Sequence, residues 1–308
     1  MKPAFPARLL PLPALIALAV AILAYSVSLV VLQRLPGASV FEPLFLLAVL
    51  GVAFPLLAWV CTLKPRSTPQ AAEAPQLPGL LAYLAVFSIL VLGWGFSALN
   101  QALPDEPAQS IAQLILKLVT MVVLPAWLFL RLRPGAQALF STRWLLLVFV
   151  VMSLAYLALQ AVFGRGLTTL GELAPTATTL AWAIPACLLW QTLEAGLCEE
   201  VLFRRILQEK IALASGSQVA AVVWASLLFG LAHAPGLWLR GANLMEGVAQ
   251  ATPGWAVAYS IVMIAPAGIA FGVLWARTRS LWLIVPLHGM VDLLPNLAPF
   301  IRAWTGLD

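Results

Sequence analysis

The chain has 308 residues, of which 62% are hydrophobic and only 9% are charged, and its formal net charge is +5. A soluble domain needs far less apolar sequence to build its core, so this composition excludes an ordinary soluble protein and predicts a polytopic membrane protein. The positive charge does not indicate nucleic-acid binding, because the basic residues are scattered through short connections instead of being clustered with aromatic residues. Membrane topology accounts for them better.

Runs of about 20 apolar residues predict transmembrane helices, since a helix of that length crosses the hydrocarbon core of a bilayer. We therefore expect an all-α fold, a polytopic membrane helix bundle of about eight to nine transmembrane helices. The larger count applies when the run at 177–198 and its charged continuation to Leu213 form one element. The expected spans are 9–32, 41–63, 79–101, 110–130, 143–163, 177–198, 217–235, 254–276 and 280–301.

The positions of the basic residues predict the orientation of the chain. With the N-terminus in the cytoplasm, most of the 17 Lys and Arg residues fall on the cytoplasmic side, which is the pattern of inner-membrane proteins. We expect a multi-pass protein of a bacterial inner membrane with a cytoplasmic N-terminus. The proline-rich stretch from Lys64 to Pro78 predicts a flexible cytoplasmic connection, and the glycines of 236–253 predict an outer loop.

The first candidate site is the charged stretch from Glu199 to Arg205, Glu-Glu-Val-Leu-Phe-Arg-Arg, which directly follows an apolar run. Charged side chains are costly near lipid, so a group of them indicates a function. On a helix Glu200 and Arg204 share one face, which predicts a structural ion pair. Glu199 then points about 100° away from that pair and is free for chemistry. Glu194, one turn earlier, has no partner that the sequence identifies.

The chain has only two histidines, and each stands four residues from another notable side chain. Phe229 precedes His233 by this spacing, and Asp292 follows His288 by the same spacing, so each pair shares a helix face. One histidine in an apolar helix is usually a core residue. Two histidines with spaced partners, both downstream of a Glu-Glu pair, indicate a functional site.

Together these motifs resemble the CAAX-protease and bacteriocin-processing family of intramembrane glutamic endopeptidases. The pattern of that family is EExxxR, then FxxxH, then HxxxN or HxxxD, and the chain matches it in order and phase over roughly residues 180–300. The resemblance implies that Glu199 and His233 activate water and that His288 and Asp292 stabilise the oxyanion. An ionised Asp292 would be a poor oxyanion partner, so it must be neutral or must orient His288; burial favours the neutral form.

Peptide hydrolysis needs an activated water, a base and donors for the oxyanion, and these residues supply all three without a cofactor. We expect residues 177–301 to form the catalytic core and residues 1–163 to form N-terminal helices without an assigned role. The expected partners are a peptide or protein substrate, lipidated or not, and membrane lipids, with no nucleic acid. The resemblance does not separate a prenylated substrate from a bacteriocin precursor.

Two other interpretations use the same residues. Two histidines and one or two carboxylates are also suitable zinc ligands, although the HExxH spacing of metallopeptidases is absent. Glutamate and histidine inside a membrane can alternatively form the proton or ligand path of a non-enzymatic carrier or immunity-type protein. Hydrolysis that continues in excess chelator would argue against zinc, and binding without hydrolysis would favour the carrier.

Overall fold

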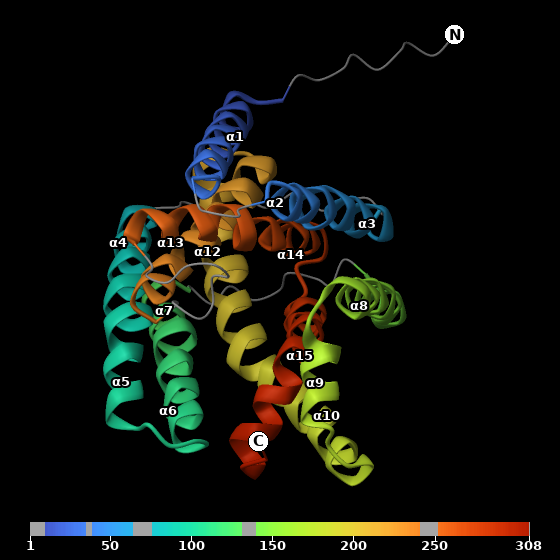
Figure 1. Cartoon of the computed structure of the whole chain (residues 1–308). Helices are drawn as coiled ribbons and strands as arrows, with labels where there is room; N and C mark the ends of the chain where they lie inside the picture. The colour runs from blue at the N-terminus through green and yellow to red at the C-terminus, as the bar shows by residue number, and fades with distance from the viewer. Residues whose placement is uncertain (1–9, 35–38, 64–75, 131–139, 241–251, 308) are drawn as a thin grey trace.

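The computed structural model describes residues 10–34, 39–63, 76–130, 140–240 and 252–307 (Figure 1). Within these ranges every regular element is a helix, which confirms the all-α prediction. The physical reason is that lipid offers no hydrogen-bond partners to the backbone, so a single spanning segment must satisfy its own N–H and C=O groups.

The described residues contain nine helical runs that are long and apolar enough to cross a membrane, so the chain is a multi-pass membrane protein. The runs are Leu12–Leu32, Phe41–Cys61, Leu77–Ala102, Ala108–Phe129, Thr142–Phe163, Ala177–Ser215, Gln218–Arg240, Pro253–Thr278 and Leu281–Thr305. The expected spans are confirmed, and the sixth run continues without a break through the charged stretch. Several basic residues used to orient the chain, and most of the connection 64–78, lie outside the described residues.

Most of the runs combine α-helices with short π-helical segments. The α-helices are α1 (Leu12–Leu32), α2 (Phe41–Leu46), α3 (Phe54–Cys61), α4 (Leu77–Phe87), α5 (Phe96–Ala102), α6 (Ala108–Lys117), α7 (Leu124–Phe129), α8 (Thr142–Phe163), α9 (Gly166–Leu173), α10 (Ala177–Gln191), α11 (Glu209–Ser215), α12 (Gln218–Arg240), α13 (Pro253–Tyr259), α14 (Ala265–Thr278) and α15 (Leu281–Thr305). The π-helical segments are η1 (Leu47–Ala53), η2 (Ser88–Gly95), η3 (Leu118–Val123), η4 (Thr192–Leu197), η5 (Glu200–Gln208) and η7 (Ser260–Ile264). Glu199 lies between η4 and η5, and π-helical turns are frequent at functional sites.

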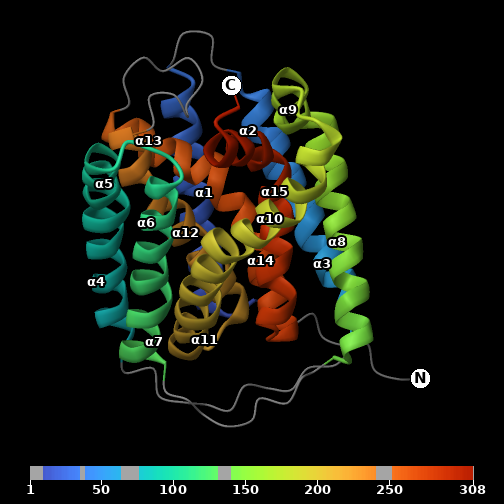
Figure 2. The same ribbon diagram turned by 90° about the horizontal axis from the view of Figure 1, so that it is seen from below.

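The runs enclose α12, which packs against α1, α14 and η2. On one side of α12 the helices α4 and α5 lie beside α6 and α7, and on the other side α15 packs against α8, α9 and α10 (Figure 1). Seen from below, α7 and α11 lie at one end of the bundle, and α9, α13 and the C-terminus lie at the other end (Figure 2). Residues from both sides of α12 can therefore meet at its surface.

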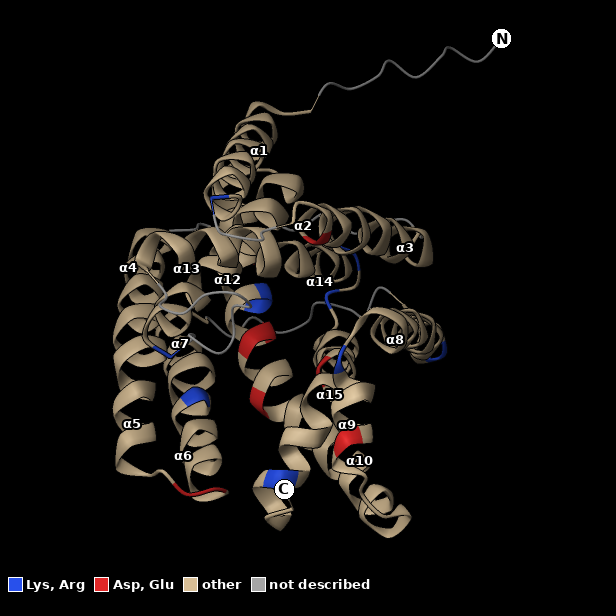
Figure 3. Cartoon of the chain, in the orientation of Figure 1, with Lys and Arg blue, Asp and Glu red and all other residues tan. Residues whose placement is uncertain are grey.

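Burial separates inner from outer helices. In the most apolar window of α12, 61% of residues are buried inside the protein, compared with 11% for α1. Large apolar side chains on the outer helices face outward, including Trp127 at 78% exposed and Trp282 at 92% exposed. Such exposure suits contact with lipid tails, whereas in water it would favour aggregation. Charged residues are sparse on the helices (Figure 3).

Part of the expected outer loop at 236–253 is helical, so that prediction was wrong at both ends. Helix α12 continues through Pro235 and Gly236 to Arg240, and α13 begins at Pro253; residues 241–251 lie outside the described ranges. Proline and glycine usually end helices, but here they pack closely on η2. A Cβ atom placed on Gly93 would lie 3.0 Å from Cβ of Pro235. Tertiary packing thus keeps α12 helical beyond the point where local sequence predicts an end.

Helix α15 approaches η4 closely because glycine stands at the crossing. A Cβ atom on Gly289 would lie 2.9 Å from the backbone N and Cα of Thr192, which real Cβ atoms do not tolerate. Small residues allow such backbone approach between membrane helices. The contact matters because His288 precedes Gly289 and is thereby placed against the Glu-Glu pair.

Candidate active site

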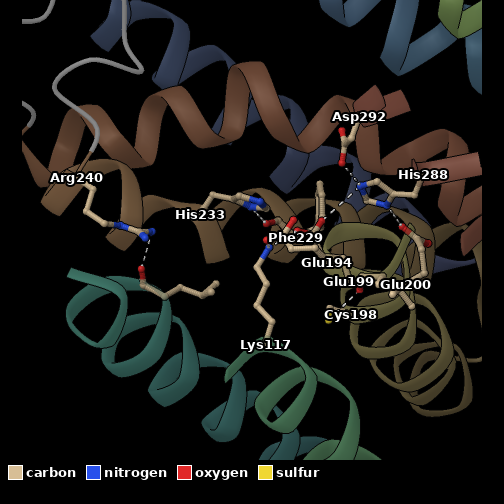
Figure 4. Close-up of polar contacts among 12 residues, drawn as sticks. Lys117, Glu194, Cys198, Glu199, Glu200, Phe229, His233, Arg240, His288 and Asp292 are labelled. Atoms are coloured by element: carbon tan, nitrogen blue, oxygen red, sulfur yellow. Dashed lines mark hydrogen bonds and ion pairs between the residues drawn. The ribbon is translucent and has the colours of Figure 1, made fainter. Parts of the chain in front are cut away.

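His288 is the centre of a buried cluster of carboxylates (Figure 4). Its Nδ1 lies 2.8 Å from Oε1 of Glu200, while its Nε2 lies 3.6 Å from Oε2 of Glu199 and 3.5 Å from Oδ2 of Asp292. An ionised carboxylate can only accept a hydrogen bond, so with Glu200 ionised Nδ1–H donates to Glu200. The imidazole is then fixed, and its Nε2 faces the two remaining carboxyl groups.

Glu200 also forms the expected pair with Arg204, and neither side chain is exposed at all. The Nε atom of Arg204 lies 3.4 Å from Oε2 of Glu200, and the guanidinium lies 4.9 Å from the centre of the Phe229 ring. Glu200 therefore does more than the structural pairing that its spacing predicts, because its other oxygen orients His288. A buried ion pair that loses one partner leaves an uncompensated charge, which typically costs about 3–5 kcal/mol.

The second histidine is oriented by its own helix. Nδ1 of His233 lies 2.8 Å from the carbonyl oxygen of Phe229, one turn earlier on α12. A carbonyl oxygen can only accept, so Nδ1 carries the proton and donates it to this bond. In the neutral ring Nε2 then has a free lone pair, which is the form that accepts a proton from water.

Glu199 and His233 line the same cavity, which has a volume of about 190 Å³. One molecule of liquid water occupies about 30 Å³, so the cavity has room for several small groups. The structure thus brings together the two residues expected to activate water. It places His288 and Asp292 next to Glu199, although neither is among the residues that line this cavity.

Lys117 is a cluster member that sequence reasoning missed. It projects from the end of α6, forms an ion pair with Glu194, and lies with Nζ 3.9 Å from Oε1 of Glu199. The only signal in the sequence was a lysine inside an apolar span, and nothing linked it to Glu194. The ionisable neighbours of Glu199 are Lys117 of α6 and His288 of α15, so they come from other helices and the spacing along its own helix did not reveal them.

The described residues contain no group of three or more His, Cys, Asp or Glu side chains arranged to hold a metal ion. Of the cysteines, Cys198 is buried and its Sγ donates to the carbonyl oxygen of Leu193 at 3.3 Å. The groups around His288 are carboxyl oxygens that lie between 2.8 Å and 3.6 Å from its two ring nitrogens.

The fold and the cluster define a class: polytopic α-helical membrane proteins with a buried carboxylate–histidine site. Residues 180–294 match the family model described as type II CAAX prenyl endopeptidase Rce1-like. This match confirms the resemblance to the CAAX-protease family and supports a CAAX-type membrane protease, which is a hydrolase acting on peptides or proteins. The matched region contains Glu199, Glu200, His233, His288 and Asp292, while Lys117 lies outside it. No curated protein and no solved structure matches the chain.

The two neighbouring arginines should differ sharply in their effect on stability. Arg204→Ala leaves Glu200 buried without its cation, so the midpoint of thermal unfolding in detergent should fall by many degrees or the protein should fail to fold. Arg205 pairs with Glu209, but 33% of its side chain is exposed, so Arg205→Ala should cost about 1 kcal/mol or less. Equal shifts in the two variants would contradict the account of Arg204.

Proposed function

We propose that the protein is an intramembrane endopeptidase in which Glu199 and His233 activate a water molecule for attack on a peptide bond. The observation that supports this most directly is that both side chains line one cavity, while Glu200 fixes His288 immediately beside Glu199. The base and the residue that holds the water are then in contact with a space of suitable size, and the imidazole of His288 lies beside the base. A general base in such a position typically contributes a factor of about 10²–10⁴ to the rate.

In the proposed reaction Glu199 takes a proton from water as the water oxygen bonds to the carbonyl carbon of the substrate. The lone pair on Nε2 of His233 accepts the other hydrogen bond of that water and holds it in place. Negative charge develops on the carbonyl oxygen. His288, whose Nδ1–H is donated to Glu200, stabilises this charge by donating from Nε2 as a doubly protonated imidazolium. The proton on Glu199 then passes to the amide nitrogen as the C–N bond breaks, which releases a carboxylic acid and an amine.

Asp292 acts in this proposal as a neutral hydrogen-bond donor. Its Oδ2 and Oε2 of Glu199 both face Nε2 of His288, at 3.5 Å and 3.6 Å. Two ionised carboxylates so close to one nitrogen repel each other, and burial adds to the cost of the second charge. A protonated Asp292 removes that repulsion and offers a second donor to the oxyanion.

The walls of the cavity favour an apolar or lipidated peptide as substrate. The polar lining residues are accompanied by an apolar wall, which gives apolar groups of a substrate a surface to pack on and includes Leu92, Phe96, Met121, Phe203 and Leu237. In the proposed arrangement residues 177–301 form the catalytic core, and the helices before residue 163 complete the cavity. The distribution of basic residues supports a cytoplasmic N-terminus in a bacterial inner membrane.

The role of Glu199 can be tested with a quenched fluorescent peptide carrying a prenylated cysteine and the purified protein in lipid. Glu199→Gln removes the base but keeps the shape of the side chain, so kcat/KM should fall at least about a hundredfold while folding is preserved. Glu172→Gln, at an exposed position on α9, is the matched control and should retain full activity. Full activity in Glu199→Gln would exclude it as the base.

The same assay separates the alternative interpretations. Wild-type hydrolysis should continue in excess chelator, because the proposed reaction uses no metal. Loss of activity that zinc restores would favour the zinc protease, and binding of the peptide without any hydrolysis would favour a carrier or immunity-type protein.

Asp292→Asn tests the protonation state of Asp292. An amide offers N–H donors at the same reach, so the variant should keep activity and retain it to higher pH than wild type, since it has no carboxyl proton to lose. An ionised Asp292 that orients His288 would instead make the substitution cost at least about tenfold, or about 1.4 kcal/mol of barrier. Identical alkaline limbs in the two pH–rate profiles would exclude the donor role.

A further inference from the structure

Lys117 brings a buried positive charge to the active site from a part of the chain outside the family match. It is the last residue of α6, whereas the match covers residues 180–294. Only 12% of its side chain is exposed, and it lines the same cavity as Glu199 and His233. An ammonium group is costly to bury at membrane depth, so a lysine in this position indicates a function in the site.

The ammonium group of Lys117 serves two carboxylates unequally. Its Nζ forms a close ion pair with Oε1 of Glu194 and lies 3.9 Å from Oε1 of Glu199. Figure 4 shows the side chain reaching from α6 toward these carboxylates. An ammonium group has three N–H donors, so it can be held by one carboxylate and still act on another. Glu194 therefore fixes the position of the charge, and Glu199 lies within its field.

Glu199 has both acids and bases around it. Among the described residues, the ionisable groups near it are Lys117 of α6, Glu194 of η4, Cys198, Glu200 and Arg204 of the same helical run, His233 and Arg240 of α12, and His288 and Asp292 of α15. Ionised carboxylates close to one another repel, which favours a proton on one of them. A proton on Glu199 would remove the base that the proposed reaction needs.

The other cations beside Glu199 are engaged elsewhere. Arg204 lies against Glu200, and in the proposed reaction His288 donates to Glu200 and to the oxyanion. Lys117 contacts neither of these groups in the described structure, because its printed partners are the two carboxylates on its own side of the cavity. Its charge is thus available to Glu199.

We infer that Lys117 is a positioning residue of the proposed reaction: anchored by Glu194, it holds Glu199 in the ionised form that takes a proton from water. The inference rests on the proposed endopeptidase function. No proton moves to or from Lys117 itself. A direct hydrogen bond from the ammonium group would make Glu199 a weaker base, whereas a charge 3.9 Å away keeps it ionised and leaves its oxygen free. Helix α6 then contributes to catalysis.

Two substitutions that break the same ion pair separate this role from a structural one. Lys117→Met keeps the length of the side chain but removes the charge, so the acid limb of kcat/KM against pH should move up by at least about one pH unit. Glu194→Gln removes the competing carboxylate and leaves Lys117 to Glu199 alone, so the acid limb should move down. Loss of a purely structural ion pair would affect both variants alike.

Two further variants serve as controls in the same assay, with full-length protein in phosphatidylcholine vesicles and the prenylated peptide. Lys117→Arg keeps the positive charge and should give a profile close to that of wild type. Arg302→Gln, at an exposed position near the end of α15, removes a charge elsewhere and should leave the acid limb unchanged.

A measurement without substrate assigns the effect to Glu199, because protonation of His233 would also lower activity in acid. The infrared C=O stretch of protonated carboxyl groups is followed against pH, and the band that Glu199→Gln removes belongs to Glu199. This band should appear at higher pH in Lys117→Met than in wild type, and at lower pH in Glu194→Gln.

Three results would overturn the inference. Acid limbs that move in the same direction in Lys117→Met and Glu194→Gln would make the ion pair structural. A Glu199 band that titrates in Lys117→Met as it does in wild type would show that Lys117 does not keep Glu199 ionised. A Lys117→Arg profile equal to that of Lys117→Met would show that the charge is not what matters.

The remaining outcomes are also decisive. If Lys117→Met does not fold, Glu194→Gln decides alone, and an acid limb and a Glu199 band that stay in place or move up would contradict the inference. If wild type cuts no peptide, the endopeptidase function fails, whereas the infrared titration still tests whether Lys117 keeps Glu199 ionised.

Discussion

The site depends on one fully buried carboxylate, Glu200, which is shared between a cation and an imidazole. One oxygen lies near Arg204 and the other lies 2.8 Å from Nδ1 of His288, so the same charge links η5 to α15. Arg204 in turn lies over the ring of Phe229 on α12, which extends the link to the helix that carries His233. In a low-dielectric interior none of these charges can lose its partner cheaply, so the three helices are held in a single arrangement.

As a result, the two adjacent glutamates have different roles. Glu200 is committed to structure and orientation, whereas Glu199 faces a cavity and has only longer contacts, 3.6 Å to His288 and 3.9 Å to Lys117. Four carboxyl groups, those of Glu194, Glu199, Glu200 and Asp292, surround two permanent cations, Lys117 and Arg204. If all four carboxyl groups were ionised, negative charge would exceed positive charge, and protons on the imidazoles or on Asp292 would balance the excess. This is why we propose a neutral Asp292.

Much of the fold follows from run length and composition, because a lipid-spanning segment has few alternatives to a helix. The motif residues were also predictable, since i,i+4 spacing places Glu200 near Arg204 and His288 near Asp292 on their own helices. What the sequence did not reveal are contacts between helices. Lys117 with Glu194, Glu200 with His288 and Arg240 in the cavity all depend on how α6, α12 and α15 cross, and local spacing contains no information on that. The helical course of α12 beyond Pro235 was missed for the same reason.

The different roles of the two glutamates can be measured directly, because the chain has only two histidines. In ¹⁵N-histidine NMR spectra of the folded protein, Glu200→Gln should shift the Nδ1 resonance of His288, which loses its ionised partner, and should leave His233 unchanged. Glu199→Gln should leave the Nδ1 resonances of both rings where they are in wild type. If Glu200→Gln leaves His288 unchanged, or if the two variants shift its Nδ1 alike, Glu200 does not hold His288 and the account is wrong.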